Sequence, residues 1–154
     1  MGGDLHRPVL LLHVLSAFLY AAGYIGTNLL TEVARRTDDS TARRYALRFS
    51  SVTDRLYEIG GTLVALTGVV ALFVFGYSLF SPWLLAATGL YLAIVVTSIV
   101  FWARVGREVD RAIQAGDDER AVALLRSQTN IVVSRTENVL FVLLIALMVL
   151  RPGS

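Results

Sequence analysis

The chain has 154 residues, of which 55% are hydrophobic and only 17% are charged, and its formal net charge is +2. Globular proteins have about 25% charged residues, so this composition excludes an ordinary soluble domain and indicates a membrane protein. The absence of cysteine excludes disulfides, thiolate metal sites and cysteine nucleophiles.

Four apolar segments are each suited to a transmembrane helix: residues 9–31, 57–77, 83–104 and 131–150. About 20 apolar residues cross a bilayer, because a helix rises about 1.5 Å per residue and the hydrocarbon core is about 30 Å thick. We therefore expect one all-α transmembrane domain over residues 1–154, folded as an up-down four-helix bundle. The first segment is longer than the apolar region of a signal peptide, so we expect it to be retained.

Polar and small residues recur along the first span at steps of three and four. They are His13, Ser16, Tyr20, Gly23 and Thr27. Such residues mark helix contacts in membranes, because small side chains permit close approach and polar ones form hydrogen bonds across helices. The pattern predicts that this face points inward, where Gly61, Ala65 and Gly68 of the second span would meet it.

The two long polar connections, residues 32–56 and 105–130, are predicted to be helical hairpins that extend the spans into the cytoplasm. After a polar break, Ser40 is expected to cap a helix that runs into the second span. The third span is expected to continue to a stop at Ala115-Gly116. The acids from Asp117 to Glu119 then open a helix that runs on into the fourth span.

Arginine is distributed very unevenly between the two sides of these spans. The outer side holds only Arg7 and Arg151, whereas the two long connections and the span ends next to them hold Arg35, Arg36, Arg43, Arg44, Arg48, Arg55, Arg104, Arg107, Arg111, Arg120, Arg126 and Arg135. The positive-inside rule places these connections in the cytoplasm and both termini outside, in a bacterial inner membrane. Because this arginine flanks a membrane, we expect membrane lipids and no nucleic acid as partners.

The fourth span has only 12 cleanly apolar residues, Val139 to Leu150, which is about 18 Å of helix and too short to cross alone. Polar residues must therefore enter the membrane, where we expect an inner polar cluster of Asn28, Glu32, Arg55, Glu58, Arg104, Arg135, Glu137 and Asn138. An unpaired carboxylate there is costly, so Glu137 and Glu58 are predicted to contact Arg55, Arg104 or Arg135. Two interpretations stay open: a lock on helix register, or a site for an anionic ligand, lipid headgroup or proton.

His13 is the other candidate binding residue. A neutral imidazole is a common heme ligand, and Met148 is predicted to lie at a similar depth, so the two form a candidate pair of axial heme ligands. The alternative is a histidine hydrogen-bonded to a neighbouring helix. We identify no catalytic residue and no metal site, because the chain has no nucleophile elbow and no phosphate-binding loop, and whether the protein is an enzyme stays open.

Two short motifs resemble a poorly characterised bacterial family of predicted integral membrane proteins of unknown function. They are Leu12-His13-Val14-Leu15-Ser16-Ala17-Phe18-Leu19-Tyr20 with Gly23, and the Ala115-Gly116-Asp117 turn with the Ala-Val-Ala-Leu-Leu-Arg helix after it. More distantly, the His-then-Gly pattern is similar to copper-resistance D-type proteins and to membrane protoporphyrinogen oxidases, where a first-helix histidine is implicated in heme binding. Tyr20 stands where the oxidase pattern has Trp, and its later Lys has no counterpart. The resemblance thus implies heme binding through His13 as an alternative function.

The function that we expect first is a non-enzymatic accessory or assembly subunit of a membrane complex, in contact with other membrane subunits or with further copies of itself. A heme-binding redox protein using His13 is the alternative. A small oligomeric transporter is the third hypothesis, with Glu137 as the acid within the span.

Overall fold

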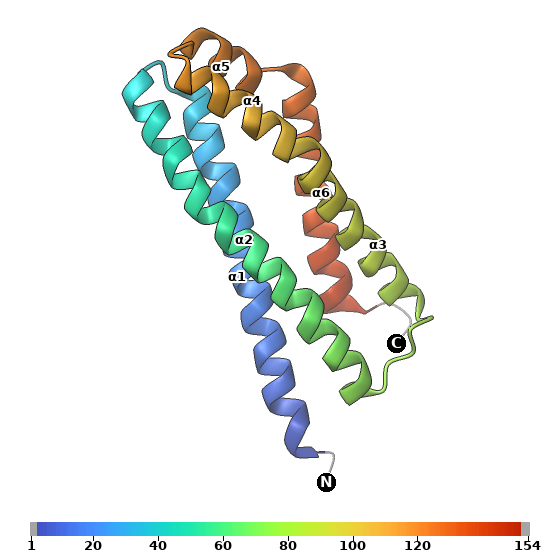
Figure 1. Ribbon diagram of the computed structural model, residues 1–154. Helices are drawn as coiled ribbons and strands as arrows, with labels where there is room; N and C mark the ends of the chain where they lie inside the picture. The colour runs from blue at the N-terminus through green and yellow to red at the C-terminus, as the bar shows by residue number, and fades with distance from the viewer. Residues whose placement is uncertain (1–2, 152–154) are drawn as a thin grey trace. The chain divides into compact units, whose positions relative to one another are not determined.

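The computed structural model describes residues 3–151, which are almost entirely helical and contain no β-strand (Figure 1). The all-α prediction is confirmed. In chain order the elements are α1 (Gly3–Arg36), α2 (Ser40–Phe75), α3 (Pro82–Thr97), a π-helical turn η1 (Ser98–Trp102), α4 (Ala103–Gln114), α5 (Asp118–Leu125) and α6 (Gln128–Leu150).

Four helical stretches are long and apolar enough to cross a membrane: Leu5–Arg36, Ser40–Phe75, Pro82–Gln114 and Gln128–Leu150. This confirms the four predicted spans and the class of membrane helical bundle. The last stretch has 23 residues. Because a crossing takes about 20 residues, a span that ends at Leu150 includes Glu137 and Asn138.

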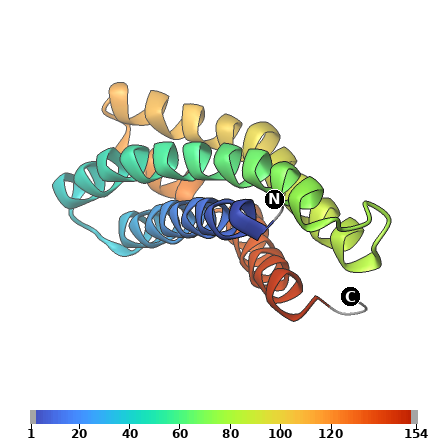
Figure 2. The same ribbon diagram turned by 90° about the horizontal axis from the view of Figure 1, so that it is seen from below.

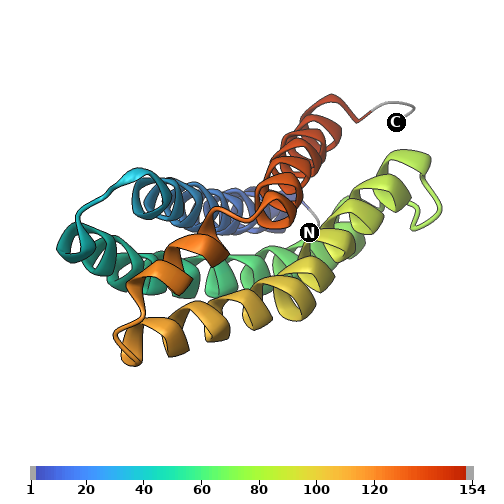
Figure 3. The same cartoon turned by 90° about the horizontal axis from the view of Figure 1, so that it is seen from above.

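The chain forms two compact units, Met1–Ser78 and Leu79–Ser154, which we call the N-terminal and C-terminal units. In the N-terminal unit, α1 and α2 lie side by side along their length (Figures 1 and 2). In the C-terminal unit, α3 packs on α6, and α4 turns back through α5 (Figure 3). The single domain over residues 1–154 stays a prediction.

The turn between α1 and α2 is held by its own side chains. Asp39 is the N-cap of α2, and its carboxylate accepts a hydrogen bond from the backbone N–H of Thr41 at 2.8 Å. The prediction that Ser40 caps this helix is therefore wrong by one residue. Asp39 is in an extended conformation that directs its side chain to the first turn, and a carboxylate is favoured at the positive end of the helix dipole.

Arg43 also stabilises this turn. Its guanidinium is buried and donates hydrogen bonds to the carbonyl oxygens of Ala34 at 3.3 Å and Thr37 at 2.8 Å. Carbonyls at the end of a helix lack partners within the helix, so this side chain satisfies the C-terminus of α1 and ties it to α2.

The connections of the C-terminal unit are also capped. The predicted stop is confirmed, since α4 ends at Gln114 and Gly116 has a φ of 73°, a conformation that glycine adopts at low cost. Asp117 then caps α5 through the N–H of Arg120 at 2.9 Å. The helix does not run on into the fourth span as expected. It breaks after Leu125, because Ser127 caps α6 and Asn130 donates to the carbonyl of Leu124 at 2.7 Å.

Candidate functional site

Two glycines set the contact between α1 and α2. A Cβ on Gly60 would lie 2.6 Å from the Cα of Tyr20, and a Cβ on Gly23 would lie 2.7 Å from the Cα of Tyr57. Each glycine therefore faces the backbone of the opposite helix, which is the close approach that small residues permit in membranes. From the sequence we named Gly61, Ala65 and Gly68 for this contact. Gly68 does face His13, with 3.4 Å from its added Cβ to the His13 ring, but Ala65 is exposed and Gly60 makes the close crossing.

Polar side chains of the two helices meet in three layers along this contact. His13 pairs with Thr67, Tyr20 stacks on Tyr57 with ring centroids 4.9 Å apart, and Thr27 pairs with Thr53. Ser16 and Tyr20 are buried. The inward face that was predicted for the first span is confirmed, and its polar groups serve to join α1 to α2.

The tautomer of His13 follows from the hydrogen bonds of Thr67. The Nδ1 atom of His13 lies 2.9 Å from the Thr67 hydroxyl oxygen, and this hydroxyl donates to the carbonyl of Leu63 at 2.6 Å. A hydroxyl has one proton to donate, so Nδ1 of His13 is the donor in the pair, and in the neutral imidazole Nε2 then carries the lone pair. His13 and Met148 belong to different units, and their pairing on a heme stays a prediction.

The layer nearest the α1–α2 turn includes an acid that the sequence analysis missed. The Thr27 hydroxyl donates to a carboxylate oxygen of Asp54 at 2.8 Å and lies 2.8 Å from the Thr53 hydroxyl. Asp54 lies three residues before Tyr57, on the same helical stripe, and this spacing would have found it. Its neighbour Arg55, which we had chosen instead, is exposed.

The predicted inner polar cluster is divided between the two units. Its N-terminal half is Asn28, Glu32, Arg55 and Glu58, and its C-terminal half is Arg104, Arg135, Glu137 and Asn138. Within the N-terminal half, Asn28 donates to the carbonyl of Tyr24 at 2.9 Å, and Glu32 binds Arg35 and Arg36, each at 2.6 Å. Glu58 is exposed. Whether the eight residues form one cluster stays a prediction.

Glu137 is the buried acid of the C-terminal unit. It is 6% exposed, and one of its carboxylate oxygens accepts a hydrogen bond from the indole N–H of Trp102 at 2.7 Å. In the described part of the chain this indole takes the place of the arginine that we expected. Arg104 pairs with Glu108 at 3.1 Å, and Arg135 is exposed. Long arginine side chains reach water from the membrane boundary, whereas an indole can donate from within the hairpin.

Trp102 occupies the last position of the π turn between α3 and α4. A π turn contains one residue more than an α turn, so it rotates the following residues about the helix axis, and such turns occur often at functional sites. No hydrophobic pattern in the sequence announces this turn, because the apolar run of the span continues through it. The Trp102–Glu137 pair joins η1 to α6 at a buried carboxylate, and we take it with His13–Thr67 as the candidate site.

Chemically, both pairs can hold or donate protons. Metal ligands usually come in groups of three or more. Within residues 3–151 no group of three His, Cys, Asp or Glu side chains is placed to hold a metal ion. The hydrogen bonds of these polar groups join α1 to α2 and η1 to α6.

Comparison with known proteins identifies the family of this chain. The chain matches none of the curated proteins and none of the solved structures. Residues 8–152 match the family described as predicted integral membrane protein, DUF2269. The match covers most of the chain and confirms the resemblance to a family of predicted membrane proteins, while the distant similarity to copper-resistance and oxidase proteins stays a prediction. The chain therefore belongs to the DUF2269 family of predicted integral membrane proteins.

Proposed function

We propose that the protein is a non-enzymatic accessory or assembly subunit of a membrane complex, in contact with other membrane subunits or with further copies of itself. The observation that supports this is the use of the polar groups: His13, Thr27 and Glu137 each bind a side chain of their own hairpin. Large apolar side chains meanwhile face outward on every span, such as Phe18 at 73% and Phe73 at 79% exposure. Lipid or partner helices must cover these faces.

The alternative function is a heme-binding redox protein, and one observation favours it. The bond from Nδ1 of His13 to Thr67 fixes the imidazole and directs the lone pair to Nε2. Histidines that ligate metals commonly hold their second nitrogen in this way. Heme would then bind at Nε2 of His13 and would supply one-electron chemistry.

Purification in mild detergent tests these two functions together. We expect colourless protein that elutes with other membrane subunits or as an oligomer, and we expect His13→Ala to leave this elution unchanged. A Soret band that disappears in His13→Ala and persists in His6→Ala would overturn the first proposal and establish the second. His6 is the matched control, because it is the other histidine of α1.

For location and orientation, we infer a bacterial inner membrane with both termini outside. The arginine bias supports this, and the tight turn at Arg43 between α1 and α2 would then lie in the cytoplasm.

The natural absence of cysteine permits a clean test of this orientation. We expect Leu79→Cys, at the exposed link between the two units, to react with a membrane-impermeant maleimide on intact cells. Thr41→Cys, exposed at the start of α2, should react only after the inner membrane is opened. The reverse pattern would contradict the inferred orientation.

A further inference from the structure

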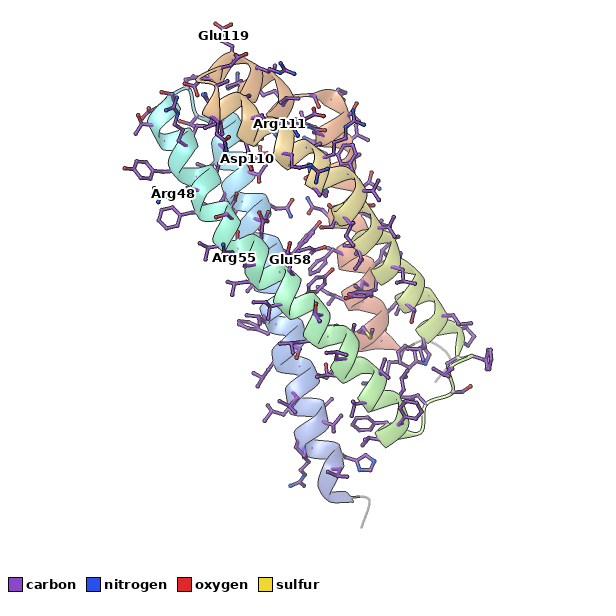
Figure 4. The ribbon with its side chains drawn as sticks, viewed as in Figure 1. Arg48, Arg55, Glu58, Asp110, Arg111 and Glu119 are labelled. Atoms are coloured by element: carbon purple, nitrogen blue, oxygen red, sulfur yellow. The ribbon has the colours of Figure 1, made fainter. Side chains whose placement is uncertain are left out.

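Two arginines of α2 lie on its exposed face. Arg48 and Arg55 are seven residues apart, which is close to two helical turns, so they point the same way. Both are exposed, and Figure 4 labels them along one helix. The small Ser51 lies between them on this face, and its hydroxyl donates to the carbonyl of Arg48 at 2.7 Å.

The other arginines near this turn have protein partners. Arg35 and Arg36 bind Glu32, and Arg43 binds backbone carbonyls. Within residues 3–151, the guanidinium groups of Arg48 and Arg55 have no acidic partner. Glu58 follows Arg55 by one turn but forms no ion pair with it in that part of the chain, and the carboxylate of Asp54 binds Thr27. The positive charge on this face is therefore available to a ligand.

An apolar stripe runs beside the two arginines. Tyr45, Phe49 and Val52 are 59%, 60% and 55% exposed, and they follow one another at steps of four and three. Leu56 and Ile59 continue the stripe into the membrane-spanning part of α2. A basic row next to an aromatic and aliphatic row is the arrangement that amphipathic helices present to a membrane surface.

The depth of the arginines matches the headgroup layer. Twenty residues separate Arg55 from Phe75 at the other end of α2, which corresponds to about 30 Å and to the thickness of the hydrocarbon core. Placing Phe75 at the outer edge of the core therefore puts the Cα of Arg55 at its inner boundary and the Cα of Arg48 about 10 Å beyond it. The headgroup region is about 5–8 Å thick on each side, and arginine side chains extend along the helix toward it. With this placement, phosphate groups of the leaflet would lie between the α-carbons of Arg55 and Arg48 along the helix axis.

We propose that Arg48 and Arg55 bind the phosphate of an anionic phospholipid, whose glycerol and upper acyl chains pack against Phe49 and Val52. Guanidinium groups form strong, charge-assisted hydrogen bonds with phosphate. The ammonium group of a zwitterionic lipid would be repelled by the two arginines, so the site should prefer a lipid with net negative charge. This site goes beyond the proposed function and does not depend on which complex the protein joins.

Native mass spectrometry of the detergent-solubilised protein tests the proposal, with phosphatidylglycerol and phosphatidylcholine as probes. We expect the wild type to retain phosphatidylglycerol in preference. The double variant Arg48→Gln/Arg55→Gln should bind it about thirtyfold more weakly, because each basic side chain near an anionic surface changes partitioning about fivefold. Arg48→Lys/Arg55→Lys retains the charge and should keep most of the preference.

The matched control is Arg107→Gln/Arg111→Gln, which removes two exposed arginines from one face of α4. This pair should retain wild-type binding, and millimolar inorganic phosphate should not displace the lipid. Equal loss of phosphatidylglycerol in both double variants would overturn the proposal, as would equal binding by the wild type and Arg48→Gln/Arg55→Gln. Displacement by phosphate would overturn it in favour of a free-anion site. Loss of self-association in the α2 variant with unchanged lipid binding would assign the face to a protein contact.

Discussion

Gly60→Ala is expected to lower the free energy of unfolding by about 1–3 kcal/mol, the usual cost of overpacking a tight contact. The added Cβ would lie 2.6 Å from the Cα of Tyr20, which is backbone and cannot rotate away. The helices would separate along the crossing and weaken the hydrogen bond between His13 and Thr67 as well. Gly60→Leu should abolish the folded hairpin. Unfolding in increasing sodium dodecyl sulfate, followed by circular dichroism, measures both effects.

Gly89→Ala and Gly106→Ala are the matched controls for this change. Nothing lies within 4 Å of a Cβ at either position. Because alanine is favoured over glycine in a helix by about 0.5–1 kcal/mol, these variants should be neutral or slightly more stable. If Gly60→Ala unfolds at the same detergent concentration as the controls, the close crossing of α1 and α2 is refuted.

Trp102→Phe should have the second large effect, because it removes the indole donor of Glu137 and leaves the buried carboxylate without it. Loss of a hydrogen bond to a buried group costs about 1–3 kcal/mol, and more when the group is charged. The double variant Trp102→Phe/Glu137→Leu should regain part of the loss, since neither partner is then left unsatisfied. The same unfolding measurement on both single variants and the double variant gives the coupling energy. Additive losses would show that the bond at 2.7 Å contributes nothing.

Glu137→Gln separates the two interpretations of this acid. Glutamine keeps an acceptor oxygen for the indole but loses the carboxylate. A register lock should therefore survive the change with a small loss of stability, and the protein should keep its partners in mild detergent. Unchanged unfolding together with loss of a bound partner, lipid or proton flux would instead identify Glu137 as a functional group.

The spans and the inward face of α1 were predictable because both depend on local patterns. Hydropathy over about 20 residues identifies a span, and steps of three and four place His13, Tyr20 and Thr27 on one face. The helix stop at Gly116 was predictable for the same reason, since its φ of 73° is one that glycine adopts readily.

The partners of the buried groups were not predictable in this way. We paired Glu137 with an arginine because of charge alone. In the structure its carboxylate accepts a hydrogen bond from the neutral indole of Trp102 instead. Choosing Gly60 over Gly61 requires knowledge of which residue meets the opposite backbone. Similarly, the choice between Asp39 and Ser40 as the cap depends on one backbone angle. Each of these features depends on how two segments meet, so the sequence of either segment alone does not determine it.

The π turn between Ser98 and Trp102 also has a consequence for comparing relatives of this chain. Such a turn contains one extra residue, and a homologue that lacks it would continue as plain α-helix, with the residues after the turn rotated by about 100° about the helix axis. An ungapped alignment across this segment would then equate residues that point in different directions. A tryptophan aligned with Trp102 in such a homologue would no longer face the acid that corresponds to Glu137, so the two positions should be gained or lost together with the length of this segment.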